Sequence, residues 1–180
     1  MKRSEMRHAA DRALEFYEKA GIALTEAEKA SLEVADFGLN RLEQMGLELI
    51  TYVNTQRVCA KEMVLFPGQT CPEHRHVGQG GLPGKEETFR CRFGTVYLYV
   101  EGEGERDKIA AALPETDVTV FHEIILTPGR QYTIFPGTRH WFQGGGQGAV
   151  VSEFSTRSSD ETDVFTDARI QRMPQIDEDA

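Results

Sequence analysis

Three of the five histidines lie at spacings that could bring their imidazole nitrogens to one point. His74 and His76 form an H-x-H pair. On an extended strand, residues i and i+2 project from the same face, so both rings can reach a common ligand. The pair by itself is better explained by an exposed polar turn after Pro72. It indicates a metal site only if a further ligand lies nearby.

Glu87 supplies such a ligand. In the strand expected from residue 86, the odd-numbered positions carry the apolar side chains Phe89, Cys91 and Phe93, and that face must form the core. Glu87 shares this face. A buried carboxylate is costly unless it gains a cation, strong hydrogen-bond donors or a raised pKa. Two histidines and a divalent metal would satisfy it.

His140 follows a turn at residues 135–139, at the end of a strand whose partner could bring it next to the H-x-H pair. Three neutral imidazoles and one carboxylate form a donor set that leaves positions for water or substrate oxygens. This set suits Mn, Fe, Co, Ni or Zn. We therefore predict that a divalent metal is held by His74, His76, Glu87 and His140.

The remaining two histidines are not expected to join this set. His8 lies in a polar N-terminal helix and is expected to be exposed. His122 shares a strand face with Val120 and Ile124, which places it in the core or at the wall of a pocket.

Lys61 could assist chemistry at such a metal. It shares a strand face with Cys59 and Met63, and would sit among apolar neighbours if that face points inward. If Ala60 and Val64 form the core face instead, Lys61 is solvated, and strand parity does not choose between the two. A buried ammonium beside the metal could polarise a substrate oxygen or transfer a proton.

Glu153 is the second candidate for a catalytic residue. It lies near the end of an apolar strand expected over residues 149–155, where a carboxylate beside a pocket could act as a general base. Metal-bound imidazoles have no free lone pair for that task. The alternative is that Glu153 forms an ion pair with Arg157.

The elements that must position these residues are mainly strands. An apolar stripe from Met6 to Tyr17 predicts a helix that ends at Gly21, and the capping box Thr25-x-x-Glu28 predicts a second helix to about residue 37. Segments rich in Val, Ile, Phe, Tyr and Thr then predict strands at residues 47–54, 57–66, 86–100, 119–126, 131–135 and 149–155. Gly and Pro clusters separate them, including a turn expected at residues 144–146.

No helical pattern recurs between these strands, so a parallel βαβ sheet is disfavoured and an antiparallel sandwich or barrel is expected. We expect one domain over residues 1–180, with a helical segment at 1–46, a β-barrel core at 47–156 and a C-terminal extension at 157–180. The polar acidic tail from residue 175 is expected to lack order. The glycine-rich loop at 78–84 is either a lid or a flexible connection.

Composition limits the possible partners and location. The formal net charge of −9 disfavours nucleic acid and anionic membranes as partners. No apolar run is long enough to span a bilayer, and the N-terminus has no secretory pattern. Three cysteines without C-x-x-C spacing argue against a disulfide framework. A cytoplasmic protein is expected.

Two motifs in this order resemble those of the cupin superfamily. The first is Gly68-(x5)-His74-x-His76-(x10)-Glu87-(x6)-Gly94, and the second is Gly129-(x5)-Phe135-x-Gly137-(x2)-His140. The spacer before Glu87 is longer than usual, which makes Glu86 a rival ligand, but strand parity and the spacing to Gly94 favour Glu87. The resemblance implies a mainly β, jelly-roll type cupin barrel with short N-terminal helices.

The whole chain further resembles the D-lyxose isomerase family. The resemblance extends over the N-terminal helical segment and the segments 60–62, 72–76, 78–88, 136–142 and 153–156. It implies an aldose–ketose isomerase for D-lyxose and D-xylulose, often also for D-mannose and D-fructose. It further implies a divalent metal, Mn²⁺ before Fe, Co, Ni or Zn, a homodimer, and Lys61 facing the pocket.

Such a reaction transfers a proton between C1 and C2 of a small sugar, and a metal would stabilise the enediol. Two alternatives stay open. A cupin Fe(II) dioxygenase would use the same four ligands with O₂ in place of a sugar. A non-catalytic cupin would bind a metal or ligand without turnover.

Overall fold

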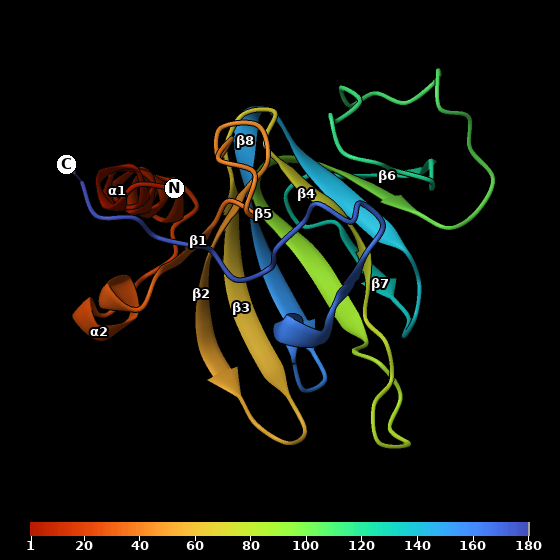
Figure 1. The fold of residues 1–180 in the computed structure, drawn as a ribbon, viewed down its shortest axis with the longest axis horizontal. Coiled ribbons are helices and arrows are strands. Elements are labelled where there is room, and N and C mark those ends of the chain that lie inside the picture. The colour runs from red at the N-terminus through yellow and green to blue at the C-terminus, as the bar shows by residue number, and fades with distance from the viewer. Residues whose placement is uncertain (180) are drawn as a thin grey trace.

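The computed structural model describes residues 1–179 and is mainly β (Figure 1). Two helices come first, α1 (Arg3–Lys19) and α2 (Glu26–Ala30). The strands are β1 (Glu33–Ala35), β2 (Leu47–Asn54), β3 (Cys59–Leu65), β4 (Thr70–Arg75), β5 (Glu87–Val100), β6 (His122–Leu126), β7 (Gln131–Ile134), β8 (His140–Ser155) and β9 (Val164–Phe165), with a 3₁₀ turn, η1 (Asp160–Thr162), before β9. Among these described residues, no helix is both long and apolar enough to cross a membrane.

The strands form one curled sheet in the order β1-β2-β3-β8-β4-β9. β5 pairs with β8 along most of its length and also with β6 and β7. Every pairing between these named strands is antiparallel, as the spacing of the turns predicts. The expectation of a mainly β barrel with N-terminal helices is confirmed.

The inner face of the curled sheet forms the main hydrophobic core. Strand alternation directs one set of side chains inward, so Leu49 of β2, Met63 of β3, Phe89 of β5 and Val151 of β8 pack in one cluster. Charged residues of the same strands share this inward face and therefore line the interior. The core thus supplies the low-polarity walls around any polar group placed there.

α1 covers the outer face of the sheet at one end. Its apolar stripe buries Ala9, Ala13 and Phe16 against Val64 of β3 and Val150 of β8. The periodicity from Met6 to Tyr17 predicts this helix, but the buried face also includes Ala9 and Phe16, which the predicted stripe does not contain. The helix therefore closes the side of the sheet that faces away from the interior.

The second helix is shorter than predicted. Thr25 caps α2 as expected, accepting a hydrogen bond from the Glu28 backbone N–H, but the helix ends at Ala30. The next residues form β1, in which Val34 pairs with Glu48 of β2. Sheet pairing therefore overrides the helical pattern expected as far as residue 37.

The turn predicted at residues 144–146 is also wrong, because β8 continues through these glycines. Gly144 pairs with Val96 of β5. A Cβ at Gly144 would lie 2.6 Å from the backbone oxygen of Phe66, so glycine is required here by close packing and not by a turn. As a result, His140 begins a long strand and does not end one.

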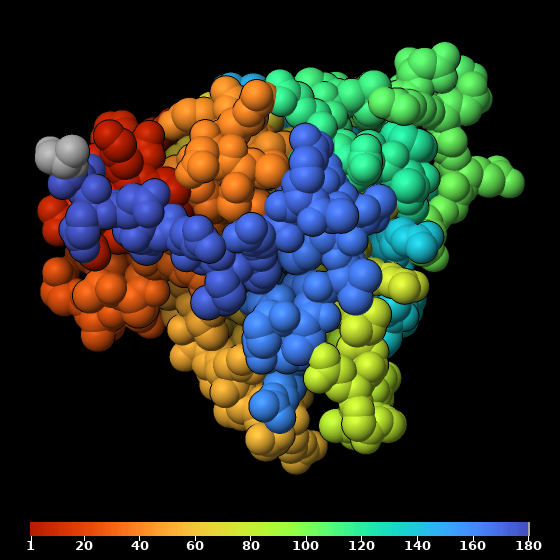
Figure 2. All heavy atoms as spheres, viewed as in Figure 1, coloured from red at the N-terminus to blue at the C-terminus, as the bar shows by residue number. Residues whose placement is uncertain are grey.

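The C-terminal segment crosses the open side of the sheet and returns to α1 (Figures 1 and 2). β9 pairs with β4, and the segment then runs toward the N-terminus. Asp177 bridges to Lys2, and Glu178 forms an ion pair with Arg3. The described part of the tail is thus fixed on α1, contrary to the expected lack of order, and Ala180 lies outside the described residues.

Candidate metal centre and its acid–base cluster

The interior of the curled sheet contains a cavity with one apolar and one ionisable side. Met63, Phe89 and Phe142 contribute to the apolar wall. The ionisable side is lined by Lys61, His74, His76, Lys85, Glu87, Glu153, Asp160, Asp163 and Arg172. Most of these residues lie on β3, β4, β5 and β8 or in the C-terminal segment, and His76 and Lys85 lie in the connection between β4 and β5.

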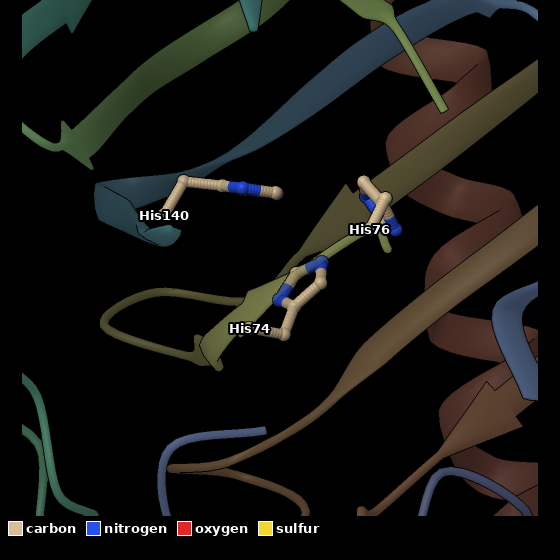
Figure 3. Close-up of side chains that lie close together, drawn as sticks. All are labelled: His74, His76 and His140. Atoms are coloured by element: carbon tan, nitrogen blue, oxygen red, sulfur yellow. The ribbon is translucent and has the colours of Figure 1, made fainter. Parts of the chain in front are cut away.

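His74 and His76 line this cavity, and the His140 ring lies close to both of them (Figure 3). His74 lies near the end of β4, and His76 lies just beyond it. His140 opens β8 and pairs directly with His74 in the sheet. One ring nitrogen from each of the three lies within 4.8 Å of the others, and all three residues are buried. The sheet thus brings His140 to the H-x-H pair, as the sequence predicts.

Each imidazole has its Nδ1 atom engaged. His74 Nδ1 lies 2.8 Å from the carbonyl oxygen of Pro72, and His140 Nδ1 lies 3.0 Å from that of Thr138. A carbonyl oxygen can only accept, so Nδ1 carries the proton in both rings. This tautomer leaves the Nε2 lone pair free for a metal. His76 Nδ1 lies 2.5 Å from Oδ1 of Asp163.

The Glu87 carboxylate faces the same point. Its Oε1 atom lies 3.1 Å from His76 Nε2 and 3.0 Å from His140 Nε2, and its Oε2 atom lies 2.7 Å from Lys85 Nζ. Glu87 is only 1% exposed, whereas its rival Glu86 is exposed at the surface. The structure therefore places Glu87 on the inward face, where strand parity puts it.

These residues fit a divalent transition metal. His140 Nε2 is buried and has no aligned hydrogen-bond partner, although Glu87 lies close to it. A buried nitrogen without a partner is costly, and a cation bound at its lone pair removes that cost. Three neutral imidazole nitrogens with a neighbouring carboxylate oxygen form a donor set suited to such an ion.

Burial and charge set the protonation of these groups. Burial holds the pKa of His74 well below its ordinary value, with the other two imidazoles adding to the effect. Burial also disfavours protonated His76, but the Glu87 and Asp163 carboxylates overcome it and raise its pKa to about 9. Binding of an ion at His76 Nε2 would therefore displace a proton and leave the ring neutral. Although burial opposes its ionisation, Lys85 and His76 hold the pKa of Glu87 well below the usual range.

Lys61 and Glu153 face the cavity from paired positions of β3 and β8. Lys61 is buried and donates to Ser158 Oγ at 3.0 Å and to Asp160 Oδ2 at 2.6 Å. The strand face of Cys59, Lys61 and Met63 is thus the inward one, which strand parity alone leaves open.

Glu153 pairs with Lys85 and not with Arg157. Its Oε1 atom lies 3.1 Å from Lys85 Nζ and accepts from Ser155 Oγ at 2.9 Å. Arg157 donates instead to the side chain of Gln56. The alternative of an ion pair between Glu153 and Arg157 is therefore wrong, and the carboxylate stays at the cavity.

Four ionisable residues that line the cavity are absent from the sequence prediction. Lys85 lies two positions before Glu87, so strand parity could have placed it on the inward face. Asp160, Asp163 and Arg172 lie in the C-terminal extension, where no periodicity marks a buried face. No local pattern could have identified those three.

The two remaining histidines lie away from this cavity. His8 is exposed on α1, as expected. His122 is half-buried at a surface hollow, where its Nδ1 atom lies 2.8 Å from the carbonyl oxygen of Glu103. It belongs neither to the main hydrophobic core nor to the residues that line the cavity.

Comparison with known proteins gives a consistent result. The model of the D-lyxose isomerase family matches residues 18–180. The D-lyxose ketol-isomerase of Cohnella laeviribosi is 60% identical over 99% of this chain and 100% of its own length. The D-lyxose/D-mannose isomerase of Thermosediminibacter oceani is 56% identical over 99% of each chain.

Solved structures show the same architecture at low identity. The L-ribose isomerase of Geodermatophilus obscurus gives a TM-score of 0.73 at 17% identity, covering 94% of each chain. That of Cellulomonas parahominis with L-ribose gives 0.73 at 16% identity, covering 98% of each chain. At this identity the likeness shows the fold alone, which is the cupin type.

Proposed function

Because the chain belongs to the D-lyxose isomerase family, we propose that it is a metal-dependent aldose–ketose isomerase. Its substrates would be D-lyxose and D-xylulose, and also D-mannose and D-fructose, since a relative at 56% identity is named D-lyxose/D-mannose isomerase. One observation carries the proposal. The cavity lined by His74 and His76, next to His140, also holds a buried carboxylate, Glu153, paired with Lys85 at 3.1 Å.

Aldose–ketose isomerisation moves one proton from C2 to C1 and another from the C2 hydroxyl to the C1 oxygen. The site therefore needs a base that reaches both carbons and cationic groups near both oxygens. A divalent ion held by His74, His76, Glu87 and His140, with Mn²⁺ proposed first, would supply a Lewis acid that stabilises the negative charge of the enediol.

The protein side chains would perform the proton transfers. Glu153 takes the proton from C2 and returns it to C1, since its carboxylate faces the cavity and no imidazole is free for this role. Lys85 orients that carboxylate. Lys61, buried on the neighbouring strand, donates to a sugar oxygen and accepts the proton of the other.

We further propose that the enzyme acts in the cytoplasm as a homodimer. Three buried free thiols, Cys59, Cys71 and Cys91, suit a reducing compartment. Val53, Ala60 and Phe154 pair in one row across β2, β3 and β8, and both Val53 and Phe154 are exposed. A second copy of the chain would cover this apolar row.

The test is turnover of metal-stripped protein on D-lyxose and D-mannose, before and after Mn²⁺ is restored. We expect ketose only when the metal is present. The variant Glu87→Ala should lose this activity, and Glu86→Ala is the matched control because Glu86 is exposed beside it. Absence of ketose with every divalent ion tested would refute the isomerase proposal.

A further inference from the structure

We propose that the C-terminal segment from Ser158 to Arg172 is a cap that completes the metal centre, and that Asp163 is its positioning residue. Asp163 fixes the His76 ring so that Nε2 faces the ion. This inference rests on the metal centre of the proposed function. It concerns residues outside the strands that carry the histidines, and it assigns a role to an extension that has no recognisable motif.

The three imidazoles are not oriented in the same way. His74 and His140 each have Nδ1 within hydrogen-bond distance of the carbonyl of the residue two positions earlier. These carbonyl groups belong to neighbouring residues, so the local backbone alone supplies them. The partner of His76 is the carboxylate of Asp163, 87 positions along the chain. The orientation of His76 therefore depends on the tertiary placement of the cap.

β4 holds the middle of the cap. β9 pairs with it, Phe165 opposite His74 and Val164 opposite Arg75. The backbone N–H of Thr166 donates to the carbonyl oxygen of Glu73 at 3.0 Å. The strand that carries His74 and leads into His76 thus also fixes the chain directly after Asp163.

Arg172, the last residue of the cap, holds both ends. Arg172 donates to Glu33 Oε1 of β1 at 2.5 Å and to Asp160 Oδ2 at 3.1 Å. Asp160 in turn accepts from Lys61 of β3. With both ends held, Asp163 has little freedom to leave His76, and its carboxylate is itself only 7% exposed.

A buried carboxylate that accepts from Nδ1–H locks the ring and makes Nε2 a better donor to a metal. The ring centroids of Phe165 and His74 lie 5.4 Å apart, so an apolar side chain of the cap packs beside this imidazole. Loss of such an outer partner weakens metal binding by about 10–100-fold. The cap therefore contributes to metal affinity without supplying a ligand.

The experiment measures the Kd for Mn²⁺ of the full-length protein by competition with a chelator. We expect Asp163→Ala to weaken binding by about 10–100-fold. Asp163→Asn keeps an acceptor for Nδ1–H and should recover part of the loss. Glu161→Ala removes an exposed carboxylate of the same segment and should bind as the wild type does. At saturating Mn²⁺, kcat of Asp163→Ala on D-lyxose should return toward the wild-type value.

Equal Kd values for wild type, Asp163→Asn and Asp163→Ala would overturn the proposal, as would a wild type that binds no Mn²⁺. If circular dichroism shows that Asp163→Ala does not fold, Asp163→Glu takes its place in the test, because it keeps the negative charge but displaces the carboxylate. An unchanged Kd for Mn²⁺ in Asp163→Glu then refutes the positioning role of Asp163. The Kd for Mn²⁺ is measured without substrate. If the variants bind Mn²⁺ more weakly but the wild type converts no sugar, the proposed role of the cap is supported and only the proposed isomerase activity is rejected.

Discussion

Lys61, Lys85 and Glu87 keep their charges inside the cavity because their neighbours carry the opposite charge. Burial alone would neutralise Lys85, but Glu153 and Glu87 hold its pKa well above the ordinary value. Burial likewise opposes the charge on Lys61, while Glu153 and Asp160 raise its pKa. Removal of one member leaves an opposite charge buried with fewer partners, which is costly. Substitutions here should therefore keep shape and hydrogen-bonding capacity.

Glu153→Gln follows this rule and tests the proposed base. The amide is isosteric and Lys85 still pairs with Glu87, so the fold and the metal stoichiometry should be retained. An amide cannot take the C2 proton, so kcat on D-lyxose should fall by about 10²–10⁴-fold. Steady-state kinetics with metal analysis checks this result. Ser155→Ala, which removes only a hydrogen bond to Glu153, should stay close to wild type, and near-normal kcat in Glu153→Gln would assign Glu153 to ion pairing alone.

At the scale of elements, the long pairing of β5 with β8 fixes the distance between Glu87 and the strand that carries His140 and Glu153. This ladder contains a close approach of two backbones. Gly94 has φ of 70°, and a Cβ there would lie 1.9 Å from the backbone oxygen of Gly148. Only glycine avoids both the left-handed strain and the clash.

Gly94→Ala should therefore destabilise the protein strongly, on the order of 3 kcal/mol or more, because the β5–β8 backbones must separate. The matched control is Gly129→Ala, which has φ of 88° but open space around the added methyl group. That variant should lose only about 1–2 kcal/mol, the cost of the left-handed backbone alone. Urea unfolding of both variants gives the comparison, and equal losses would show that the close approach is not limiting.

The contact between α1 and the sheet buries an acid whose ionisation opposes folding. Burial raises the pKa of Glu48 to about 8, against which a hydrogen bond from Gln69 and the charge of Arg12 act only in part. The pKa of Glu48 is thus higher in the folded protein than in the unfolded chain, where it is near 4.5. The folded protein keeps its full stability below pH 4.5, where Glu48 is protonated in both states, and loses part of it as pH rises through 8.

The free energy of unfolding should consequently fall between about pH 4.5 and pH 8, by up to about 4 kcal/mol from this group. Glu48→Gln cannot ionise and should remove that part of the pH dependence. Urea unfolding of both proteins at several pH values measures the difference. Parallel curves for the two proteins would contradict a role for Glu48.

At the scale of the whole molecule, one outer part of the sheet stays without cover. α1 packs over Val64 and Val150, but the row of Val53, Ala60 and Phe154 lies beyond it, and Phe154 is 51% exposed. Apolar side chains on neighbouring strands form a contiguous surface, in contrast to scattered exposed residues. This is the surface that the proposed homodimer would bury.

Phe154→Lys should convert the dimer into a monomer, because two lysines would meet near the symmetry axis of a self-complementary contact. Sedimentation velocity should show twice the chain mass for wild type and the chain mass for the variant. Ile125→Lys changes a comparably exposed strand residue on β6 and should remain dimeric. A wild type that sediments as a monomer would reject the homodimer.

The sequence by itself determined the features that depend on local geometry. Parity along an extended strand places Glu87 with the core residues, and the i, i+2 spacing places His74 and His76 on one side. The capping box located the start of α2, and the apolar stripe located α1. In each case the residues that interact lie within a few positions, so their types and spacing carry the information.

Only the tertiary structure decided which distant residues meet. Lys61 faces inward because β3 lies between β2 and β8, a matter of sheet order that neither of its mixed faces reveals. β8 runs through Gly144 because β5 pairs with it there and the backbone of Phe66 leaves no room for a side chain. Asp163 and Arg172 reach the site from a segment without periodicity, held there by β4 and β1. Their positions follow from long-range pairing, which no local pattern encodes.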